Sequence, residues 1–255
     1  MPRVLGVIPA RLDSSRLPGK LLLAETGRSL LEHTYRAASA AKSLDELVVA
    51  TDSFEIAAEV RRFGGVVEMT GEHPSGTDRL AEVARRRPEF DVLVNVQGDE
   101  PEIDPAAVDA LAAQVTGDPA CEMATLSAPL TDPAAFADPA NVKVVCDPAG
   151  RALLFSRAPI PHPRDASGTP GGGVPECARL HVGAYAYRRA FLIRLSELPP
   201  SRLERVEKLE QLRALEAGAV LRVARIDHAA SGVDTRGDYD AFVARSRARD
   251  LRRAA

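Results

Sequence analysis

Short apolar runs alternate with helical patterns along the first half of this chain, and this alternation restricts the possible folds more than any other feature. Residues 4–8 and 47–50 are uninterrupted apolar runs, and residues 92–96 are apolar except for Asn95. Continuous apolar runs predict strands that are covered on both faces, as in parallel sheets. A weaker strand is expected near residues 66–69. The repeated strand–helix order predicts an α/β fold, with a mostly parallel central sheet and helices on both faces.

Helix start and stop signals lie between these runs. Ser29 and Asp52 each stand three residues before a glutamate, which is the spacing of a capping box. Gly64 predicts the end of the second of these helices. Residues 77–87 are expected to form a third helix, and a fourth is predicted from the Asp104-Pro105 pair to about residue 115.

The pattern changes after about residue 118. Strands are predicted at residues 122–128, 142–147, 152–156 and 181–188, with no regular helix between them. The glycine- and proline-rich residues 166–175 predict a mobile loop. A helix over 203–217, a strand over 220–226 and a helix over 238–249 complete the chain. We expect one domain over residues 1–255, with a first part of about 1–120 and a smaller β-rich part of about 121–220.

Composition excludes several classes of protein. The chain has 33 Lys and Arg against 36 Asp and Glu, a formal net charge of −3, so bulk charge does not predict a nucleic-acid partner. No apolar run approaches the ~18 residues of a membrane span, and the first residues lack the apolar core of a signal peptide. Three cysteines without pairing spacing are typical of a reducing compartment. We therefore expect a cytoplasmic protein without a membrane partner.

The loop after the first strand carries a concentration of positive charge. Residues 9–20 contain Arg11, Arg16 and Lys20, together with serines and Gly19. Open α/β sheets bind ligands at the carboxyl ends of their strands, and arginine and lysine suit a polyphosphate. The spacing is not that of a Walker A motif. The loop is interpreted either as a phosphate-binding loop or as a solvated basic loop.

Two aspartates are candidates for a metal site. Asp99 follows the strand at residues 92–96, and Asp234 stands in a glycine-led turn before the last helix. Mg²⁺ takes one or two carboxylates and leaves room for phosphate oxygens. Asp234 is alternatively a simple helix N-cap. The segment from Ser75 to Arg79 opens a helix whose amides can meet an anion or a base edge, although ordinary caps look the same.

The helix predicted over residues 203–217 places Glu210 inside its apolar arc, between Leu203 and Val206. A carboxylate there is expected to line a cavity or to form a buried pair with an arginine. Gln211 falls on the polar edge of the same helix.

Other charged and reactive groups give weaker signals. Arg157 and Arg164 flank a proline-rich segment and can receive a carboxylate or be solvated. The histidines and cysteines show neither zinc-ligand spacing nor a nucleophile motif. The arginines of the C-terminal helix are interpreted as a solvated face, or alternatively as a phosphate- or partner-binding tail.

Taken together, these segments resemble one family, the 3-deoxy-manno-octulosonate (KDO) cytidylyltransferases. The resemblance covers nearly the whole chain and rests on an ordered set of stretches: IPARLDSSRLPGK, VATD, SGTDRLAEV, VNVQGDEP, NVKVV, FSRAPIP with PRD, HVGAYAYR, LERVEKLEQLRALEAG and SGVDT. Each stretch alone is modest, but their combination in this order is specific.

The resemblance implies a nucleotidyltransferase that transfers CMP from CTP to KDO, releases pyrophosphate and serves lipopolysaccharide synthesis. It implies a nucleotide-diphospho-sugar transferase-like fold and a homodimer, with nucleotide binding in about 1–120 and sugar binding and dimerisation in about 121–220. It also implies a Mg²⁺ cofactor held by Asp99 and Asp234, and catalytic roles for these two aspartates and for Arg11 and Lys20. The implied substrate-binding residues are Ala10, Ser14, Ser75, Thr77, Arg79, Gln97, Arg157, Arg164, His181, Tyr185, Glu210 and Gln211.

Two departures from the family pattern keep alternatives open. Leu21 stands where the family commonly has proline after the loop lysine, and His162-Pro163 stands where it commonly has tryptophan and aspartate. The second departure lies near the implied sugar site, so another acidic sugar, such as 8-amino-KDO or a sialic acid, is an alternative substrate. A CTP-binding regulatory protein without catalysis is an alternative from a different class.

Overall fold

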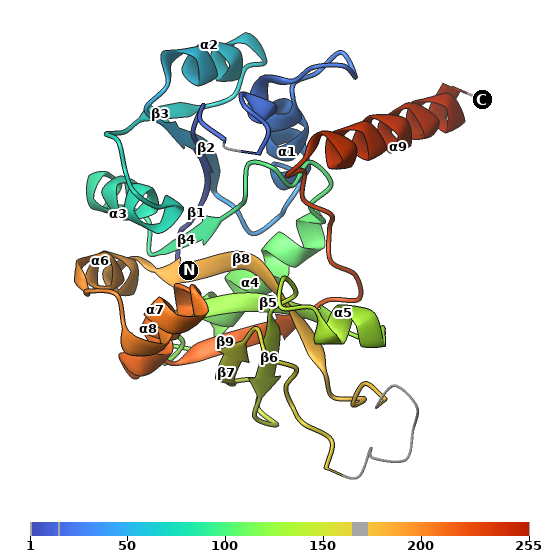
Figure 1. Cartoon of the computed structure of the whole chain (residues 1–255). Helices are drawn as coiled ribbons and strands as arrows, with labels where there is room; N and C mark the ends of the chain where they lie inside the picture. Colours follow the sequence, from blue (N-terminus) through green and yellow to red (C-terminus); the bar gives the residue numbers. More distant parts are fainter. Residues whose placement is uncertain (1, 15, 165–172, 255) are drawn as a thin grey trace. The chain divides into compact units, whose positions relative to one another are not determined.

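The computed structural model describes residues 2–14, 16–164 and 173–254 of the chain (Figure 1). These residues form two compact units, one made of residues 1–109 and 230–255 and the other of residues 110–229. The C-terminal segment thus returns to the first unit, which the sequence pattern did not predict. Most of the loop predicted at residues 166–175 lies outside the described residues.

The first unit is an α/β layer structure. Its strands lie in the order β3-β2-β1-β4 and are all parallel. The elements in chain order are β1 (Val4–Ala10), the 3-10 helix η1 (Lys20–Leu22), α1 (Leu30–Ala38), β2 (Glu46–Thr51), α2 (Phe54–Arg62), β3 (Val67–Met69), α3 (Gly76–Arg86), β4 (Val92–Asn95) and α9 (Arg236–Ala254). Helix α4 (Pro105–Gly117) carries the chain from the first unit into the second.

The strands of this unit form where the apolar runs predicted them. Strand β1 pairs with β2 on one side and β4 on the other, and Val7, Val48 and Val94 are fully buried. Helices α1 and α2 connect strands that proceed in one direction along the sheet, whereas α3 returns in the other. Right-handed crossovers therefore place α3 on the opposite face of the sheet from α1 and α2, as Figure 1 shows. The predicted α/β class with helices on both faces is confirmed.

Helix caps account for most of the helix starts. The Ser29 side chain accepts from the Glu32 amide, and the Ser75 side chain accepts from the Asp78 amide. The cap predicted at Asp52 is wrong by one residue, because the Ser53 hydroxyl caps α2 through the Ile56 amide. Capping at either position satisfies one of the free amides of the first turn.

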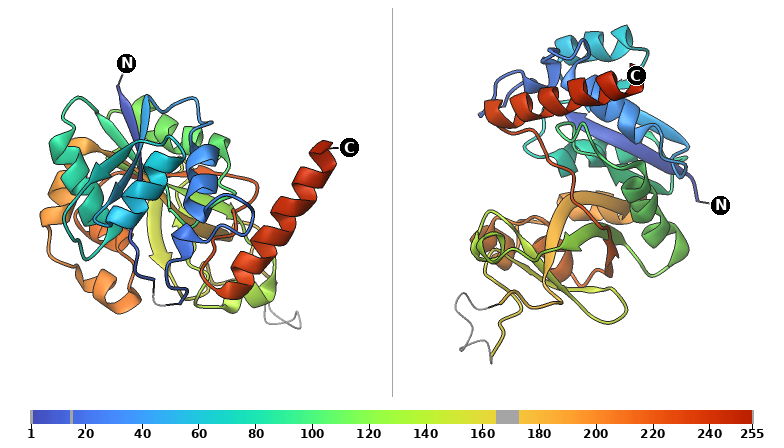
Figure 2. Two further views of the ribbon diagram at one scale, coloured as in Figure 1. Left: turned by 90° about the horizontal axis from the view of Figure 1, so that it is seen from above. Right: turned by 90° about the vertical axis from the view of Figure 1, so that its right-hand side faces the viewer.

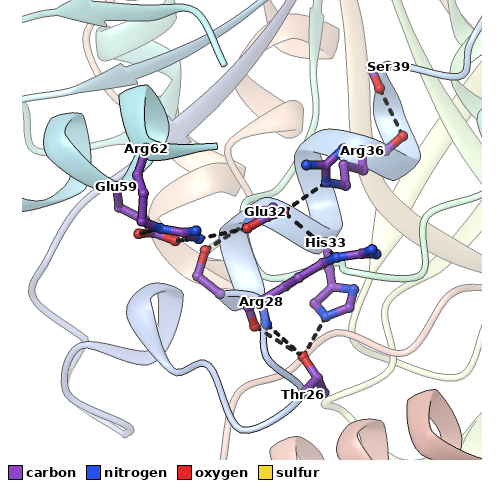
Figure 3. A network of polar contacts seen from close by, with 9 residues as sticks. Thr26, Arg28, Glu32, His33, Arg36, Ser39, Glu59 and Arg62 are labelled. Carbon is purple, nitrogen blue, oxygen red and sulfur yellow. Dashed lines mark hydrogen bonds and ion pairs between the residues drawn. The ribbon is translucent and has the colours of Figure 1, made fainter. Parts of the chain in front are cut away.

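A buried carboxylate ties α1 to α2 (Figure 3). Glu32, whose side chain is 5% exposed, accepts from Arg36 Nε at 2.8 Å and from Arg62 Nη2 at 2.7 Å. Arg62 also pairs with Glu59 on its own helix at 2.7 Å. Burial of an ionised carboxylate is costly unless it is paired, and Glu32 meets this need with arginines from two helices.

The second unit combines antiparallel and parallel pairing. Strand β5 pairs antiparallel with β8 and parallel with β9, and β6 pairs antiparallel with β7. Its elements are β5 (Met123–Pro129), α5 (Pro133–Ala137), β6 (Lys143–Cys146), β7 (Ala152–Ser156), β8 (Arg179–Arg188), α6 (Arg189–Glu197), α7 (Arg202–Glu207), α8 (Gln211–Glu216) and β9 (Leu221–Arg225). Two of its helices, α5 and α6, were not predicted. Helix α6 continues directly from β8 without a side-chain cap, so the sequence carries no start signal.

The single helix predicted over residues 203–217 is wrong. The chain breaks at Lys208, whose backbone is left-handed with φ 55°, and continues as two short helices, α7 and α8. Non-glycine residues seldom adopt this conformation, so no residue type in the segment signals the break. Leu203 and Val206 are exposed, at 42% and 78%, and Glu210 is exposed instead of lying in a buried arc.

Helix α9 is one continuous helix that follows an extended segment (Figure 2). It is longer than the predicted residues 238–249. Its arginines are not only a solvated face, because Arg245 and Arg249 both pair with Glu102, at 2.6 and 2.7 Å. The Tyr239 hydroxyl accepts from the Glu25 amide and fixes the start of the helix on the first unit. Among the described residues, no helix is both long and apolar enough to cross a membrane.

The Glu32 cluster leads to a prediction about stability. We expect Glu32→Gln to lower the free energy of unfolding by about 1–3 kcal/mol, because the arginines lose a buried charged acceptor. Asp240→Asn is the control, and its effect should stay below about 1 kcal/mol, since it removes one exposed ion pair within α9, that with Arg236. Urea unfolding of both variants measures the difference. Equal losses in the two variants would contradict the role assigned to Glu32.

Candidate active site

Lys20 connects the loop after β1 with two other segments of the first unit. Lys20 is only 8% exposed. The ammonium group donates to Asp99 Oδ2 at 2.6 Å, to the Val233 carbonyl oxygen at 2.8 Å and to Asp234 Oδ1 at 3.0 Å. An ammonium has three N–H donors, and all three are used here. The three segments therefore meet on a single nitrogen atom.

The backbone explains why these segments meet. Strands β1 and β4 are parallel neighbours, so the loops that follow them start at the same edge of the sheet. The Val233 amide donates to the Asp99 carbonyl oxygen at 2.8 Å, which fixes the turn before α9 against the loop after β4. Gly98 permits a close approach, since a Cβ there would lie 3.4 Å from the Pro9 carbonyl oxygen.

The charges of the site are balanced within the first unit. Asp99 and Asp234 bring two negative charges, and Lys20 and Arg16 oppose them, with Arg16 Nη2 3.0 Å from Asp234 Oδ1. Arg11 is exposed immediately after β1. The loop thus presents cations on a strand end, as a polyphosphate site requires. Burial and the neighbouring charge of Asp99 raise the pKa of Glu100 to about 7.

The two aspartates suit a magnesium ion. Their carboxylates already converge on one cationic nitrogen, so the pair can share a cation, and carboxylate oxygens are ligands that Mg²⁺ prefers. The described residues contain no group of three or more His, Cys, Asp or Glu side chains placed to hold a metal. Such a two-carboxylate set fits an ion that keeps phosphate oxygens and water as its other ligands.

Other residues predicted around the nucleotide lie in the same unit. Ala10 ends β1, Ser14 follows in the basic loop, and Gln97 stands two residues after the end of β4. Ser75 caps α3, and Thr77 stands in its first turn. Arg79 is buried, and its guanidinium donates to Thr70, to the Gly71 carbonyl and to Asp52. These contacts hold the loop after β3, so Arg79 organises its surroundings; contact of these residues with a nucleotide stays a prediction.

A second group of predicted residues gathers in the second unit. The rings of His181 and Tyr185 on β8 lie 5.7 Å apart, and the Tyr185 hydroxyl donates to Gln211 Oε1 at 3.3 Å. Gln211 is 3% exposed, although the helical pattern placed it on a polar edge. Its Nε2 is buried without a hydrogen-bond partner among the described residues. A buried donor without an acceptor suits a ligand oxygen.

Surrounding side chains set the protonation of this group. Desolvation lowers the pKa of His181 from 6.5 to about 3, so the imidazole is neutral at ordinary pH. Desolvation, with a contribution from the charge of Glu210, raises the pKa of Tyr185. Glu210 is exposed, but it directly precedes Gln211, the hydrogen-bond partner of Tyr185, so this residue belongs to the same group.

Arg157 and Arg164 differ in their surroundings. Arg157 Nε donates to the Glu207 carbonyl at 2.8 Å, and its Nη1 donates to the Pro139 carbonyl at 2.9 Å. Arg164 is exposed at the end of the described segment. Arg157 is therefore held in one orientation by its backbone neighbours.

Sequence reasoning did not identify two residues beside His181. The Thr125 hydroxyl lies 3.0 Å from His181 Nε2, and the Phe155 ring meets the imidazole edge-on at 4.9 Å. Thr125 is fully buried at a register shift between β5 and β8. Polar residues within a mostly apolar strand, Thr125 and Ser127, were the available signal.

Comparison with known proteins extends these observations to the whole chain. The cytidylyltransferase family model matches residues 5–226. A 3-deoxy-manno-octulosonate cytidylyltransferase of Rhodopirellula baltica is 48% identical over 241 residues, which cover 94% of this chain and 96% of that protein. A protein of the same name from Syntrophotalea carbinolica is 48% identical over 238 residues, covering 92% of this chain and 95% of its own length.

Solved structures agree with this relationship. The structure of CMP:2-keto-3-deoxy-manno-octonic acid synthetase complexed with CTP superimposes with a TM-score of 0.88 at 42% identity, covering 95% of this chain and 97% of that one. A cytidylyltransferase from Leptospira borgpetersenii has a TM-score of 0.63 at 16% identity, covers 95% of this chain and 86% of its own, and shares the fold. Full-length identity near one half, together with the structural match, shows that the chain belongs to the 3-deoxy-manno-octulosonate cytidylyltransferase family.

Proposed function

We propose that this chain transfers CMP from CTP to KDO and releases pyrophosphate, as a step toward lipopolysaccharide. The observation that carries the proposal is the 48% identity over 94% of the chain with a relative of that name. The 0.88 structural match to a synthetase complexed with CTP supports the nucleotide. The geometry of the first unit supports the chemistry, since its cations and paired carboxylates suit a nucleoside triphosphate.

In this reaction the anomeric hydroxyl oxygen of KDO forms a bond to the α-phosphorus of CTP as the bond to pyrophosphate breaks, and the hydroxyl proton is released to solvent. Lys20, Arg11 and Arg16 would bind the triphosphate and oppose the charge that develops on the leaving group. We also propose that Asp99 and Asp234 hold Mg²⁺, which when bound would polarise the α-phosphate. Lys20 pairs with both aspartates in the free protein. When the nucleotide and metal bind, Lys20 would exchange these contacts for the triphosphate, and the aspartates would exchange theirs for the metal.

The second unit would bind the sugar acid. Its carboxylate needs a cation, which Arg157 or Arg164 would supply, and its hydroxyls need neutral hydrogen-bonding groups. If the Thr125 hydroxyl donates to the Ala184 carbonyl, 2.9 Å away, it accepts from the His181 Nε2–H. His181 Nδ1 would then be an acceptor for a sugar hydroxyl, and the buried Gln211 Nε2 would be a donor.

We further propose that the protein is a homodimer associating through the second unit. Leu153 and Leu154 on β7, and Leu203 and Val206 on α7, are all at least 39% exposed. Glu207 at the end of α7 accepts from the Ser156 hydroxyl at the end of β7, which joins the two elements. Apolar side chains exposed on adjoining elements are typical of an interface.

A cytoplasmic location is proposed because cells make CTP in the cytoplasm. The free cysteines are consistent with this reducing compartment.

The substrate proposal is tested by pyrophosphate release from CTP and Mg²⁺ with KDO, 8-amino-KDO and a sialic acid. We predict the highest kcat/KM with KDO, by about tenfold or more, since a site built for a hydroxyl rejects analogues that leave its polar groups unpaired. Preference for another sugar would reassign the substrate to the alternative acidic sugars. CTP binding without release of pyrophosphate from any of the three would contradict the enzymatic function itself.

His181 gives a prediction about stability and pH. Its pKa is about 3 in the folded chain against an ordinary value of 6.5, so between these values the unfolded chain binds more protons. Stability from His181 is therefore complete above pH 6.5 and is lost as the pH falls toward 3. We expect His181→Asn to reduce the slope of unfolding free energy against pH in this window, by up to about 1.4 kcal/mol per unit.

Urea unfolding at a series of pH values measures this slope. His228→Asn is the matched control, because His228 is exposed in the same unit, and it should keep the wild-type slope. An unchanged slope in His181→Asn would show that the imidazole is not held neutral in the folded chain.

A further inference from the structure

Lys143 is a buried cation for which the proposed reaction has no use. It lies in β6 of the second unit, and its residue is 0% exposed. Its ammonium group donates to three backbone carbonyl oxygens, those of Asp138 at 3.0 Å, Asn141 at 2.7 Å and Arg157 at 2.6 Å. No carboxylate is among these partners. Burying an ammonium group is costly, so a lysine placed here must be satisfied by a fixed set of acceptors.

The acceptors belong to two separate segments. Asp138 and Asn141 lie in the loop between α5 and β6, whereas Arg157 follows the last residue of β7. The Asn141 side chain also donates to the Ala135 carbonyl at 3.0 Å, which closes the loop onto α5. Since the three donors of Lys143 are all used, its ammonium group fixes this loop relative to the Arg157 backbone.

Glu207 holds the same residue from another direction. Its Oε2 accepts from the Arg157 amide at 2.9 Å, and its Oε1 accepts from the Ser156 hydroxyl at 2.7 Å. The guanidinium group then donates to the carbonyls of Glu207 and Pro139. Pro139 lies within the loop that Lys143 fixes. Both the backbone and the side chain of Arg157 therefore depend on the loop and on the end of α7.

We propose that Lys143 is a positioning residue for sugar binding, acting through Arg157 without touching the substrate. The inference rests on the proposed function, in which Arg157 is a candidate partner of the sugar carboxylate. Desolvation lowers the pKa of Lys143, in keeping with a buried ammonium that only carbonyl dipoles hydrogen-bond. Bidentate recognition of a carboxylate needs a guanidinium in a defined plane, so loss of the Lys143 contacts should weaken sugar binding selectively.

The test is a double-mutant cycle of Lys143→Met and Arg157→Ala, with steady-state kinetics for both substrates. We expect Lys143→Met to raise the KM for KDO by about tenfold and to change the KM for CTP by less than about twofold. In the Arg157→Ala background, Lys143→Met should raise the KM for KDO by less than about twofold, because residues acting through one group are not additive. A purely structural role would instead give multiplicative effects, and that outcome would overturn the proposal.

Two further variants separate the effect on sugar binding from a general loss of stability. Leu192→Ala is the matched control, since Leu192 is a fully buried residue of α6 in the same unit. It should lower the melting temperature and leave both KM values unchanged; a raised KM for KDO in this control would overturn the interpretation. If Lys143→Met does not fold, Glu207→Gln replaces it in the cycle, with the same expected selectivity and non-additivity.

The wild-type enzyme separates failure of this proposal from failure of the proposed function. If the wild type releases no pyrophosphate with KDO, the function is wrong and the positioning role falls with it. If the wild type is active and the cycle is additive, the function stands and only the role of Lys143 is overturned.

Discussion

One buried ammonium group joins three segments of the first unit that are far apart in the sequence. Lys20 lies 79 residues from Asp99 and 214 residues from Asp234, and its nitrogen is the point where their segments meet. The return of the C-terminal segment to the first unit brings the turn before α9 to this nitrogen. Without the ammonium group, two carboxylates would face each other at the edge of a sheet. Two facing carboxylates repel each other and attract a cation, so in the proposed reaction a nucleotide-bound cation would find the position of the ammonium group favourable.

Lys20 and Lys143, one in each unit, are both buried ammonium groups, but different acceptors compensate their charges. Lys20 is neutralised by two carboxylates and one carbonyl oxygen, and carboxylates can exchange one cation for another. Lys143 is surrounded by three carbonyl oxygens, which provide a fixed polar cage and no exchangeable charge. The first arrangement is suited to chemistry in which charges are redistributed. The second is suited to holding a loop in one conformation, and the neutral His181 adds a polar group without further charge.

The sequence predicted features that depend on local patterns and failed where distant contacts decide. Apolar runs identified β1, β2 and β4, because both faces of such a strand are buried and most of its side chains are therefore apolar. The helix predicted over residues 203–217 failed because Lys208 adopts a left-handed conformation without a glycine to signal it. That error made Glu210 look buried and Gln211 look exposed, the reverse of what the structure shows. The family resemblance implied a shared sugar-binding role for Tyr185, Glu210 and Gln211, which stays a prediction, and the structure adds a hydrogen bond between Tyr185 and Gln211. The pairing of Lys20 with Asp99 and Asp234 could not be predicted from residues so far apart in the sequence.

We propose above all that Asp99 and Asp234 form one cation site that serves the bound nucleotide. Calorimetric titration of CTP with and without Mg²⁺ tests it most directly, using wild type, Asp99→Asn, Asp234→Asn and the control Asp91→Asn, an exposed aspartate that precedes β4 at its amino end. Mg²⁺ should tighten CTP binding by about tenfold or more in the wild type and in the control. This effect should disappear in both site variants, while their Mg²⁺-free affinity for CTP is retained. A full Mg²⁺ effect in Asp99→Asn and Asp234→Asn would contradict the claim.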